Sequence, residues 1–234
     1  MHSSANTPGT LYVVGTPIGN LGDTSVRMKE TLQQVDAIAC EDTRVTARLL
    51  QHLGIHKPMV SYRDDNEIRA AESLLQRLLQ GEHIALVSDA GVPTISDPGF
   101  RITRLCQKQG IPVLPIPGPC ALITALSASG LPSDSFLFLG FLLPKKAARI
   151  RTFTQYLDFP HTLLFYESPH RITKCLDDMK QVLEPERVIC VSKELTKMHE
   201  RIVSGSLSDV HAHVLSRSLK GEFVVGIAPR GFVL

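Results

Sequence analysis

Five ionisable side chains stand where an apolar run gives way to polar residues, and their types suit proton transfer. A carboxylate could take a proton from a weak nucleophile, and a lysine could stabilise a developing oxyanion or act as a base if its pKa were lowered. Charges directly after a buried strand either face a cleft or are solvated, and a carboxylate there could also begin a helix. The candidates are Glu41, Asp42, Glu167, Lys193 and Glu194.

Glycine and proline gather in three loops of the first half, each directly after an apolar run. The chain has 16 glycines and 15 prolines, and the loops span residues 15–23, 88–99 and 117–121. Glycine lets the backbone approach a ligand, and proline holds a loop rigid. In open α/β sheets, ligands bind at the carboxyl ends of the strands. The loops therefore predict a small-molecule site, although Asp97-Pro98 and Ser168-Pro169 also fit helix starts.

Familiar nucleotide, hydrolase and metal motifs are absent from the sequence. Residues 15–22 do not follow the glycine pattern of dinucleotide-binding folds, and no GxxxxGK[ST] or GxSxG motif occurs. His211 and His213 are two residues apart in an expected helix, which places their rings on different faces. We therefore expect no Rossmann dinucleotide site, no P-loop, no α/β-hydrolase triad and no metal site.

Four cations occupy the segment Pro144–Arg151, at the expected start of a helix. The helix dipole favours anions at that end, so these cations need another explanation, either phosphate contacts or a solvated face. The formal net charge of +2 excludes a histone-like polycation but allows a local basic patch.

Short apolar runs alternate with helical patterns along the chain. In the first half, such runs between helices indicate a parallel sheet covered on both faces, with strands at 11–14, 37–40, 84–87 and 113–116. In the second half, short connections favour a mixed sheet, with strands near 136–141, 162–166, 188–191, 200–203 and 223–228. We predict two α/β domains, 1–130 and 131–234, divided at the turn-forming cluster Gly130–Asp134.

Cysteine usage and hydropathy indicate the compartment. The five cysteines are odd in number, widely spaced and without a CxxC pair, which favours buried reduced thiols. Residues 1–10 lack the basic start and apolar core of an export signal. The longest apolar run, Phe136–Leu143, is shorter than the ~18 residues that span a bilayer. We expect a cytoplasmic protein without a membrane segment.

Several segments together resemble one family, the ribosomal RNA small subunit methyltransferase I branch of the tetrapyrrole methylase superfamily. They are Leu11–Asp23, Cys40–Arg44, Val87–Pro93, Tyr166–Arg171, Ser192–Thr196 and Lys220–Phe223. The segment Phe136–Arg149 is similar to the family's GFLPxK…R signature but carries an extra leucine.

The resemblance implies S-adenosylmethionine as methyl donor, and as acceptor the ribose 2′-hydroxyl of a cytidine in the decoding region of small-subunit ribosomal RNA. It further implies two α/β domains with the donor between them, a homodimer, and ribosomal RNA or the ribosomal subunit as partner. Carried over by position, the donor-binding residues are Pro17, Asp89, Ala90, Gly91, Val92, Cys120, Ala121, Glu167 and Leu195. The basic residues expected to contact RNA phosphates are Arg44, Lys145, Lys146, Arg149, Arg151 and Arg171.

Two other functions remain open on the sequence alone. One is a methyltransferase of the same superfamily that acts on a tetrapyrrole or another small substrate. The other is an RNA-binding or assembly protein that has lost catalysis, a hypothesis that the intact glycine and proline loops disfavour. The sequence does not single out the general base among the five ionisable candidates.

Overall fold

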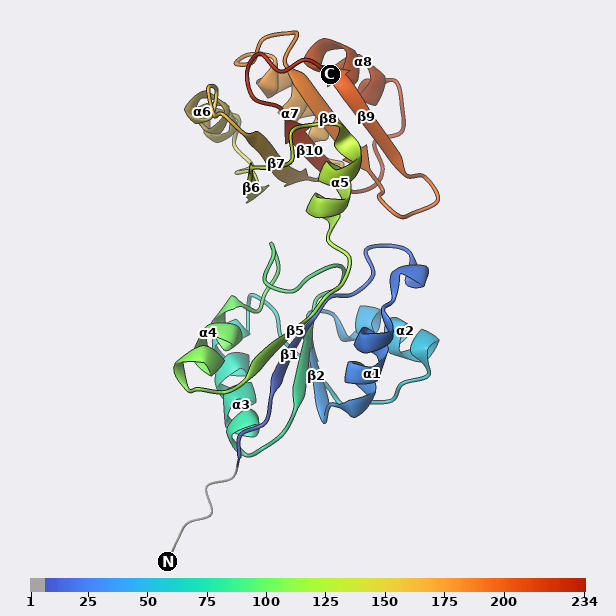
Figure 1. Cartoon of the computed structure of the whole chain (residues 1–234), viewed down its shortest axis with the longest axis vertical. Helices are drawn as coiled ribbons and strands as arrows, with labels where there is room; N and C mark the ends of the chain where they lie inside the picture. The colour runs from blue at the N-terminus through green and yellow to red at the C-terminus, as the bar shows by residue number, and fades with distance from the viewer. Residues whose placement is uncertain (1–6) are drawn as a thin grey trace, which may run out of the picture. The chain divides into compact units, whose positions relative to one another are not determined.

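The structure divides the chain at the start of a helix. The computed structural model describes residues 7–234, so residues 1–6, which belong to the segment expected to lack an export signal, lie outside the described residues. The two units are Met1–Cys120 and Ala121–Leu234. Helix α5 (Ala121–Ser129) packs on strands of the second unit (Figure 1), so the division falls before it, whereas the sequence placed it after residue 130.

A five-stranded parallel sheet forms the N-terminal unit, as the uninterrupted apolar runs predict. The sheet order is β3-β2-β4-β1-β5. Every residue of β2 and of β4 is buried, which explains why neither strand alternates polar with apolar residues. The strands are β1 (Leu11–Val14), β2 (Ala37–Cys40), β3 (Met59–Ser61), β4 (Ile84–Val87) and β5 (Val113–Ile116).

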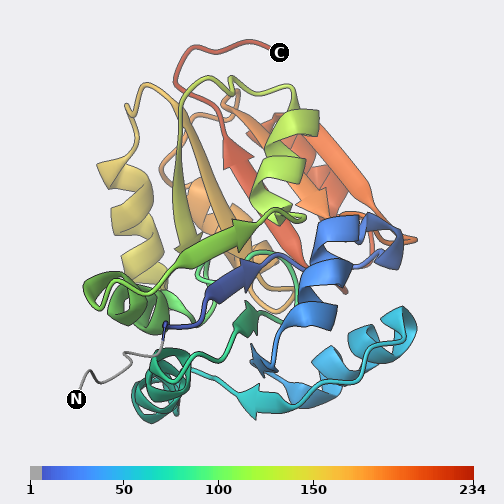
Figure 2. The ribbon, with the colours of Figure 1, turned by 60° about the horizontal axis from the view of Figure 1, so that its bottom comes forward.

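Helices cover both faces of this sheet and form two separate cores (Figures 1 and 2). On one face, Met28 and Leu50 of the first two helices pack against the sheet. On the other face, Leu74 and Ile102 of the next two do the same. The helices are α1 (Val26–Gln34), α2 (Thr43–Leu53), α3 (Glu67–Leu79) and α4 (Phe100–Lys108), and a 3₁₀ turn covers Leu21–Asp23.

The C-terminal unit has the mixed sheet that the short connections predict, in the order β6-β7-β10-β8-β9. β6 pairs in parallel with β7, and the remaining pairs are antiparallel. The strands are β6 (Phe136–Phe141), β7 (Thr162–Glu167), β8 (Val188–Lys193), β9 (Arg201–Ser206) and β10 (Phe223–Ile227).

Three helices build the main core of this unit on one face of the sheet, opposite α5 (Figure 1). Leu163 and Phe165 of β7 point into that core. Because side chains alternate along a strand, Leu164 and Tyr166 point to the face that carries α5. The three helices are α6 (Lys146–Gln155), α7 (Ile172–Met179) and α8 (Leu207–Leu215).

The structure corrects the sequence prediction at two elements. β3 was not predicted, because it has only three residues and lacks a strong apolar pattern. The helix expected from residue 168 begins at Ile172, since Glu167 accepts the Ser168 N–H and the following residues form a turn. Within residues 7–234, no helix is long and apolar enough to cross a membrane.

Candidate functional site

The three glycine- and proline-rich loops meet at the carboxyl ends of β1, β4 and β5. The Thr16 N–H donates to the Gly91 carbonyl at 2.8 Å, and the Gly91 N–H donates back at 3.1 Å. Gly91 has a φ of 87°. A Cβ there would lie 3.4 Å from Ile18 and 3.6 Å from the Pro119 carbonyl oxygen. Gly91 therefore sits between the other two loops, beside the buried Pro17.

Two glycines let the loops after β1 and β5 pack backbone on backbone. A Cβ on Gly118 would lie 2.6 Å from the Gly15 carbonyl carbon and oxygen, and a Cβ on Gly15 would lie 2.8 Å from the Gly118 Cα. These separations are shorter than real Cβ contacts allow, so neither position accepts a side chain without moving the backbone. We call the backbone surface where these loops meet the cradle, since main-chain groups without side chains can approach a small ligand closely.

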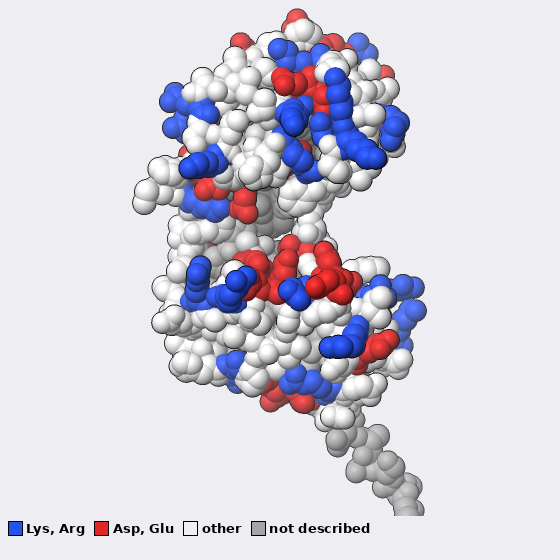
Figure 3. Space-filling model, turned by 180° about the vertical axis from the view of Figure 1, so that it is seen from behind, with Lys and Arg blue, Asp and Glu red and all other residues white. Residues whose placement is uncertain are grey.

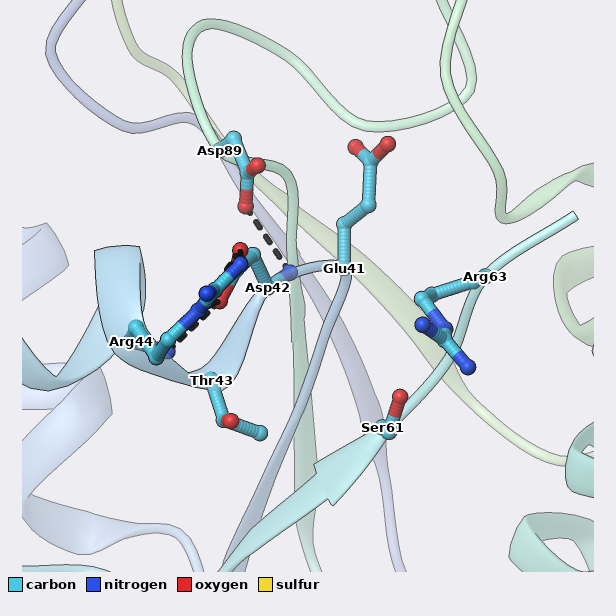
Figure 4. Close-up of a pocket in the computed structure, with 7 residues that line it drawn as sticks. All are labelled: Glu41, Asp42, Thr43, Arg44, Ser61, Arg63 and Asp89. Carbon is cyan, nitrogen blue, oxygen red and sulfur yellow. Dashed lines mark hydrogen bonds and ion pairs between the residues drawn. The ribbon is translucent and has the colours of Figure 1, made fainter.

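Asp89 joins the loop after β4 to the end of β2 (Figure 4). Its Oδ1 accepts the Asp42 N–H at 3.0 Å. Of its predicted neighbours in the donor loop, Ala90 is exposed and Val92 is half-buried. The predicted donor-binding loop is thus fixed directly beside the carboxylates that follow β2.

A pocket of about 370 Å³ opens next to Asp89, at the carboxyl ends of β2, β3 and β4. In Figure 4 the Glu41 side chain extends away from the Asp42–Arg44 pair, whereas Arg63 comes from the end of β3. The β3 side of the pocket is not predicted from the sequence, because β3 itself is not predicted. The lining residues are Glu41, Asp42, Thr43, Arg44, Ser61, Arg63 and Asp89.

Carboxylates gather along this edge of the N-terminal unit (Figure 3), and their charges help to raise the pKa of Glu41 and of Asp97. Burial, followed by the charges of Asp89, Asp64 and Asp42, raises the pKa of Glu41. Burial and next the charge of Glu41 raise the pKa of Asp97 to about 7. The pair Asp97-Pro98 predicts a helix cap, but α4 begins at Phe100 with Gly99 at the cap position, so that prediction is wrong.

Replacing Asp97 with asparagine is expected to flatten the pH dependence of stability. A carboxyl with a higher pKa in the folded than in the unfolded chain destabilises the fold increasingly as pH rises from ~4 to ~7. Over this pH window the unfolding free energy of the wild type should fall by about 2 kcal/mol, after allowing for solvent screening. The unfolding free energy of the variant should not show this fall. Urea unfolding followed by circular dichroism at pH 4.5 and pH 8 measures the difference. Equal pH dependence in the two chains would contradict the assignment.

Asp42 caps helix α2, so for this residue the helix-start interpretation is confirmed. Its side chain accepts the Arg44 N–H at 2.8 Å and forms an ion pair with the Arg44 guanidinium at 2.6 Å. The hydrogen bonds from Arg44 lower the pKa of Asp42 well below its usual range. Arg44 is therefore held in an ion pair on an acidic edge, although its side chain is 86% exposed, and its contact with RNA stays a prediction.

Glu167 and Arg171 form an ion pair inside the C-terminal unit. The Glu167 side chain has no solvent exposure, and its Oε1 accepts from the Arg171 Nε at 2.7 Å. The Arg171 Nη1 also donates to the Leu142 carbonyl at 3.2 Å. Arg171, expected at a phosphate, instead links a buried carboxylate to the loop after β6.

Arg149 is a second correction among the expected RNA contacts. Its side chain is 4% exposed and forms an ion pair with the equally buried Asp178 at 2.6 Å. Its Nη1 donates to the Pro144 carbonyl. A buried, neutralised guanidinium does not reach a phosphate, so Arg149 stabilises the unit rather than binding RNA. By contrast, Lys145 and Lys146 are exposed.

The remaining candidates of the C-terminal unit also have partners. The Lys193 Nζ donates to the Ser218 carbonyl at 2.5 Å. The Glu194 carboxylate accepts a hydrogen bond from Lys197 at 2.9 Å. Burial alone would raise the pKa of Glu194, but this bond and the hydrogen bond from the Glu222 N–H lower it below its usual value. Glu194 is thus a paired, ionised carboxylate rather than a proton acceptor tuned to neutral pH.

The last expected donor residues lie at the unit boundary and at a buried position of the C-terminal unit. Cys120 is half-buried and ends the first unit, and Ala121 is the first residue of α5. Leu195 is 6% exposed. Among residues 7–234, no group of three or more His, Cys, Asp and Glu side chains is placed to hold a metal ion.

Comparison with known sequences gives a consistent set of relatives. The family described as Tetrapyrrole (Corrin/Porphyrin) Methylases matches residues 10–211. A protein of Xylella fastidiosa named ribosomal RNA small subunit methyltransferase I is 48% identical over 222 residues, which cover 94% of this chain and 81% of that protein. A protein of Escherichia coli O157:H7 with the same name is 48% identical and covers 96% and 79% of the two chains.

Solved structures share the fold at low sequence identity. A diphthine synthase superposes with a TM-score of 0.74 at 12% identity, and the match covers 96% of this chain and 91% of the synthase chain. A uroporphyrin-III C-methyltransferase from Thermus thermophilus, complexed with S-adenyl homocysteine, gives a TM-score of 0.62 at 16% identity and covers 94% and 97%. At these identities the likeness concerns the fold alone.

Proposed function

This chain belongs to the family of tetrapyrrole (corrin/porphyrin) methylases, and on that premise we propose that it methylates small-subunit ribosomal RNA with S-adenosylmethionine as donor. The relatives at 48% identity, which span most of the chain and carry the name of a ribosomal RNA methyltransferase, support this proposal most strongly. As the acceptor we propose the ribose 2′-hydroxyl of a cytidine in the decoding region.

The described residues fit the donor. The Gly15–Gly118 contact and the Thr16–Gly91 bridge hold the three loops together backbone on backbone, which suits a ligand bound by main-chain groups. S-adenosylmethionine carries a positive sulfonium and a positive ammonium group. The carboxylates that gather beside the cradle, led by Asp89, would attract those charges. We propose that Pro17 and Asp89–Val92 hold the donor from this side.

S-adenosylmethionine, when bound, supplies a methyl group that is already activated for transfer. The chain must then align the acceptor oxygen with that methyl group, exclude water and remove one proton. A ribose hydroxyl is a weak nucleophile, so a positioned base contributes about 10²–10⁴-fold to the rate.

Glu41 is the residue that we propose as this base. It lines the pocket beside Asp89, and within residues 7–234 no hydrogen bond or ion pair holds its carboxylate. Its raised pKa makes it a better proton acceptor than an ordinary glutamate. The other carboxylate candidates are paired: Asp42 with Arg44, Glu167 with Arg171 and Glu194 with Lys197.

Transfer of a labelled methyl group tests the function. The purified chain with labelled S-adenosylmethionine should label small-subunit ribosomal RNA, offered either free or in the ribosomal subunit. It should not label a tetrapyrrole such as uroporphyrinogen III. Labelling of the tetrapyrrole alone would favour the small-substrate alternative. Donor binding without label transfer to either would favour an RNA-binding protein that has lost catalysis.

We also propose that the chain acts as a homodimer in the cytoplasm, where ribosomal RNA is modified. The family resemblance supports both points. Analytical ultracentrifugation at micromolar concentration tests the first, and a sedimentation coefficient of a monomer at all concentrations would contradict it.

A further inference from the structure

Three aromatic rings cluster toward the carboxyl ends of strands β6 and β7. Tyr166 of β7 makes edge-on contacts with Phe138 at 4.9 Å and with Phe141 at 5.5 Å between ring centroids. β6 is an edge strand of its sheet (Figure 1). Phe141 remains 54% exposed although it contacts Tyr166, and Leu143 beside it is 64% exposed. A large aromatic ring held in place yet left open to solvent is a feature that the fold alone does not require.

A bulge in β6 creates this cluster. Phe138 pairs with Leu164 and Phe141 pairs with Tyr166, so β6 advances three residues while β7 advances two. In a regular strand, side chains three residues apart point to opposite faces. The extra residue, together with Gly140 at a φ of 64°, turns Phe141 onto the same face as Phe138. The bulge thus turns the Phe141 side chain toward Tyr166.

Two buried ion pairs hold the segment that follows Phe141. The Arg171 guanidinium donates to the Leu142 carbonyl while Glu167 neutralises it. The Arg149 guanidinium donates to the Pro144 carbonyl while Asp178 neutralises it. Residues 142–144 are therefore fixed at two points by groups anchored in the core. This fixation reduces the conformational entropy that a ligand would otherwise have to remove from the segment.

The next residues supply positive charge without partners. Lys145 and Lys146 are exposed, and among the described residues no carboxylate lies within ion-pair distance of either. The chain thus sets one exposed aromatic ring close in sequence to two unpaired cations. A stacking surface beside cations is the combination with which proteins hold single-stranded nucleic acid.

We propose that Phe141, supported by Tyr166 and Phe138, is a stacking platform for an unpaired RNA base, with Lys145 and Lys146 on the flanking phosphates. The inference rests on the proposed function, because the substrate class is RNA, and it adds the site at which the strand is held. A second copy of the chain fits the surface less well. A two-fold contact centred on this surface would bring the lysine pairs of both copies together, where like charges repel.

RNA binding in the absence of donor tests the platform, with Phe141→Ala, Phe141→Trp and the double variant Lys145→Ala/Lys146→Ala. Phe100→Ala is the matched control, because Phe100 is 68% exposed in α4 of the other unit. The probe is a fluorescein-labelled single-stranded fragment of small-subunit ribosomal RNA, and a second fragment carries 2-aminopurine, whose fluorescence falls on stacking. Anisotropy at several salt concentrations gives the affinity and its salt slope.

Phe141→Ala should weaken binding about 5- to 150-fold without changing the salt slope, and should abolish the 2-aminopurine quenching. Phe141→Trp should retain both. The double lysine variant should reduce the salt slope by about 1.4. The platform is overturned if Phe141→Ala binds like the wild type or no worse than Phe100→Ala. It is also overturned if Phe141→Ala converts a dimer to a monomer, since the surface would then join two copies.

The two proposals fail in distinguishable ways. RNA methylation that does not depend on Phe141 would overturn the platform and leave the proposed function standing. RNA binding that depends on Phe141, without methyl transfer to RNA, would support the platform and contradict the proposed function. A wild-type chain that binds no RNA would overturn both.

Discussion

Changing Glu41 to glutamine should lower kcat for RNA methylation by about 10²–10⁴-fold. Glutamine keeps the size and hydrogen-bonding reach of glutamate but cannot accept the ribose proton. The same change should remove the acid limb of the pH–rate profile, because in the wild type activity falls as Glu41 becomes protonated. The raised pKa of Glu41 places that limb at a higher pH than an ordinary glutamate would. Single-turnover kinetics between pH 5 and pH 9 measure both effects.

Two controls separate proton transfer from positioning. Glu72→Gln makes the same chemical change at an exposed site on α3 and should leave kcat unchanged. Calorimetric titration should show that Glu41→Gln changes S-adenosylmethionine affinity by less than about tenfold, since Glu41 is only one of the nearby carboxylates. A variant with normal kcat, or one that has lost donor binding but keeps its acid limb, would rule out Glu41 as the base.

Replacing Gly118 with valine should abolish detectable donor binding, with affinity reduced at least ~100-fold. Even a single Cβ at this position would lie 2.6 Å from the Gly15 carbonyl group, and valine adds two methyl groups. The loops after β1 and β5 would have to separate, and the cradle proposed to hold the donor would open. Isothermal titration calorimetry with S-adenosylmethionine measures the loss.

Gly54→Ala provides the matched control for this variant. Gly54 ends helix α2 with a φ of 69°, and a Cβ there would have nothing within 4 Å. Alanine should therefore cost about 1 kcal/mol of stability and leave donor affinity intact. Circular dichroism checks that Gly118→Val remains folded, and Gly15→Ala offers a milder change at the same contact. A folded Gly118→Val chain with wild-type affinity would place the donor elsewhere.

Much of the N-terminal unit could be predicted because its determinants are local. The runs at β1, β2, β4 and β5 are apolar throughout, and every residue of β2 and β4 is buried, as a parallel sheet covered on both faces requires. Each of the three loops follows such a run, so their meeting at one edge follows from parallel pairing. The Gly15–Gly118 contact is different, because it depends on residues about one hundred positions apart, and no local pattern indicates it.

The charged residues were harder to predict, because a charge on a helix has the same local pattern whether it is exposed or paired. Arg149 stands in a basic run, yet its partner Asp178 comes from α7 and draws it into the core. Asp97 looked like a cap because proline follows it. The pKa of Asp97 is raised by burial and then by the charge of Glu41, and both depend on how β2 and β4 pair.

Ion pairing divides four of the expected RNA contacts into two groups. Arg149 and Arg171 hold carbonyl groups of residues 142–144, so they position the segment that carries Phe141. Lys145 and Lys146 remain as exposed cations. Only part of the basic run in the sequence is therefore available to phosphate.

The position of the transferred methyl group is the most direct test of the proposed function. Small-subunit ribosomal RNA labelled by this chain from S-adenosylmethionine would be digested to nucleosides and analysed by mass spectrometry. We expect a single labelled product, 2′-O-methylcytidine, from the decoding region. Label on a base, on another nucleoside, or only on a small tetrapyrrole would contradict it.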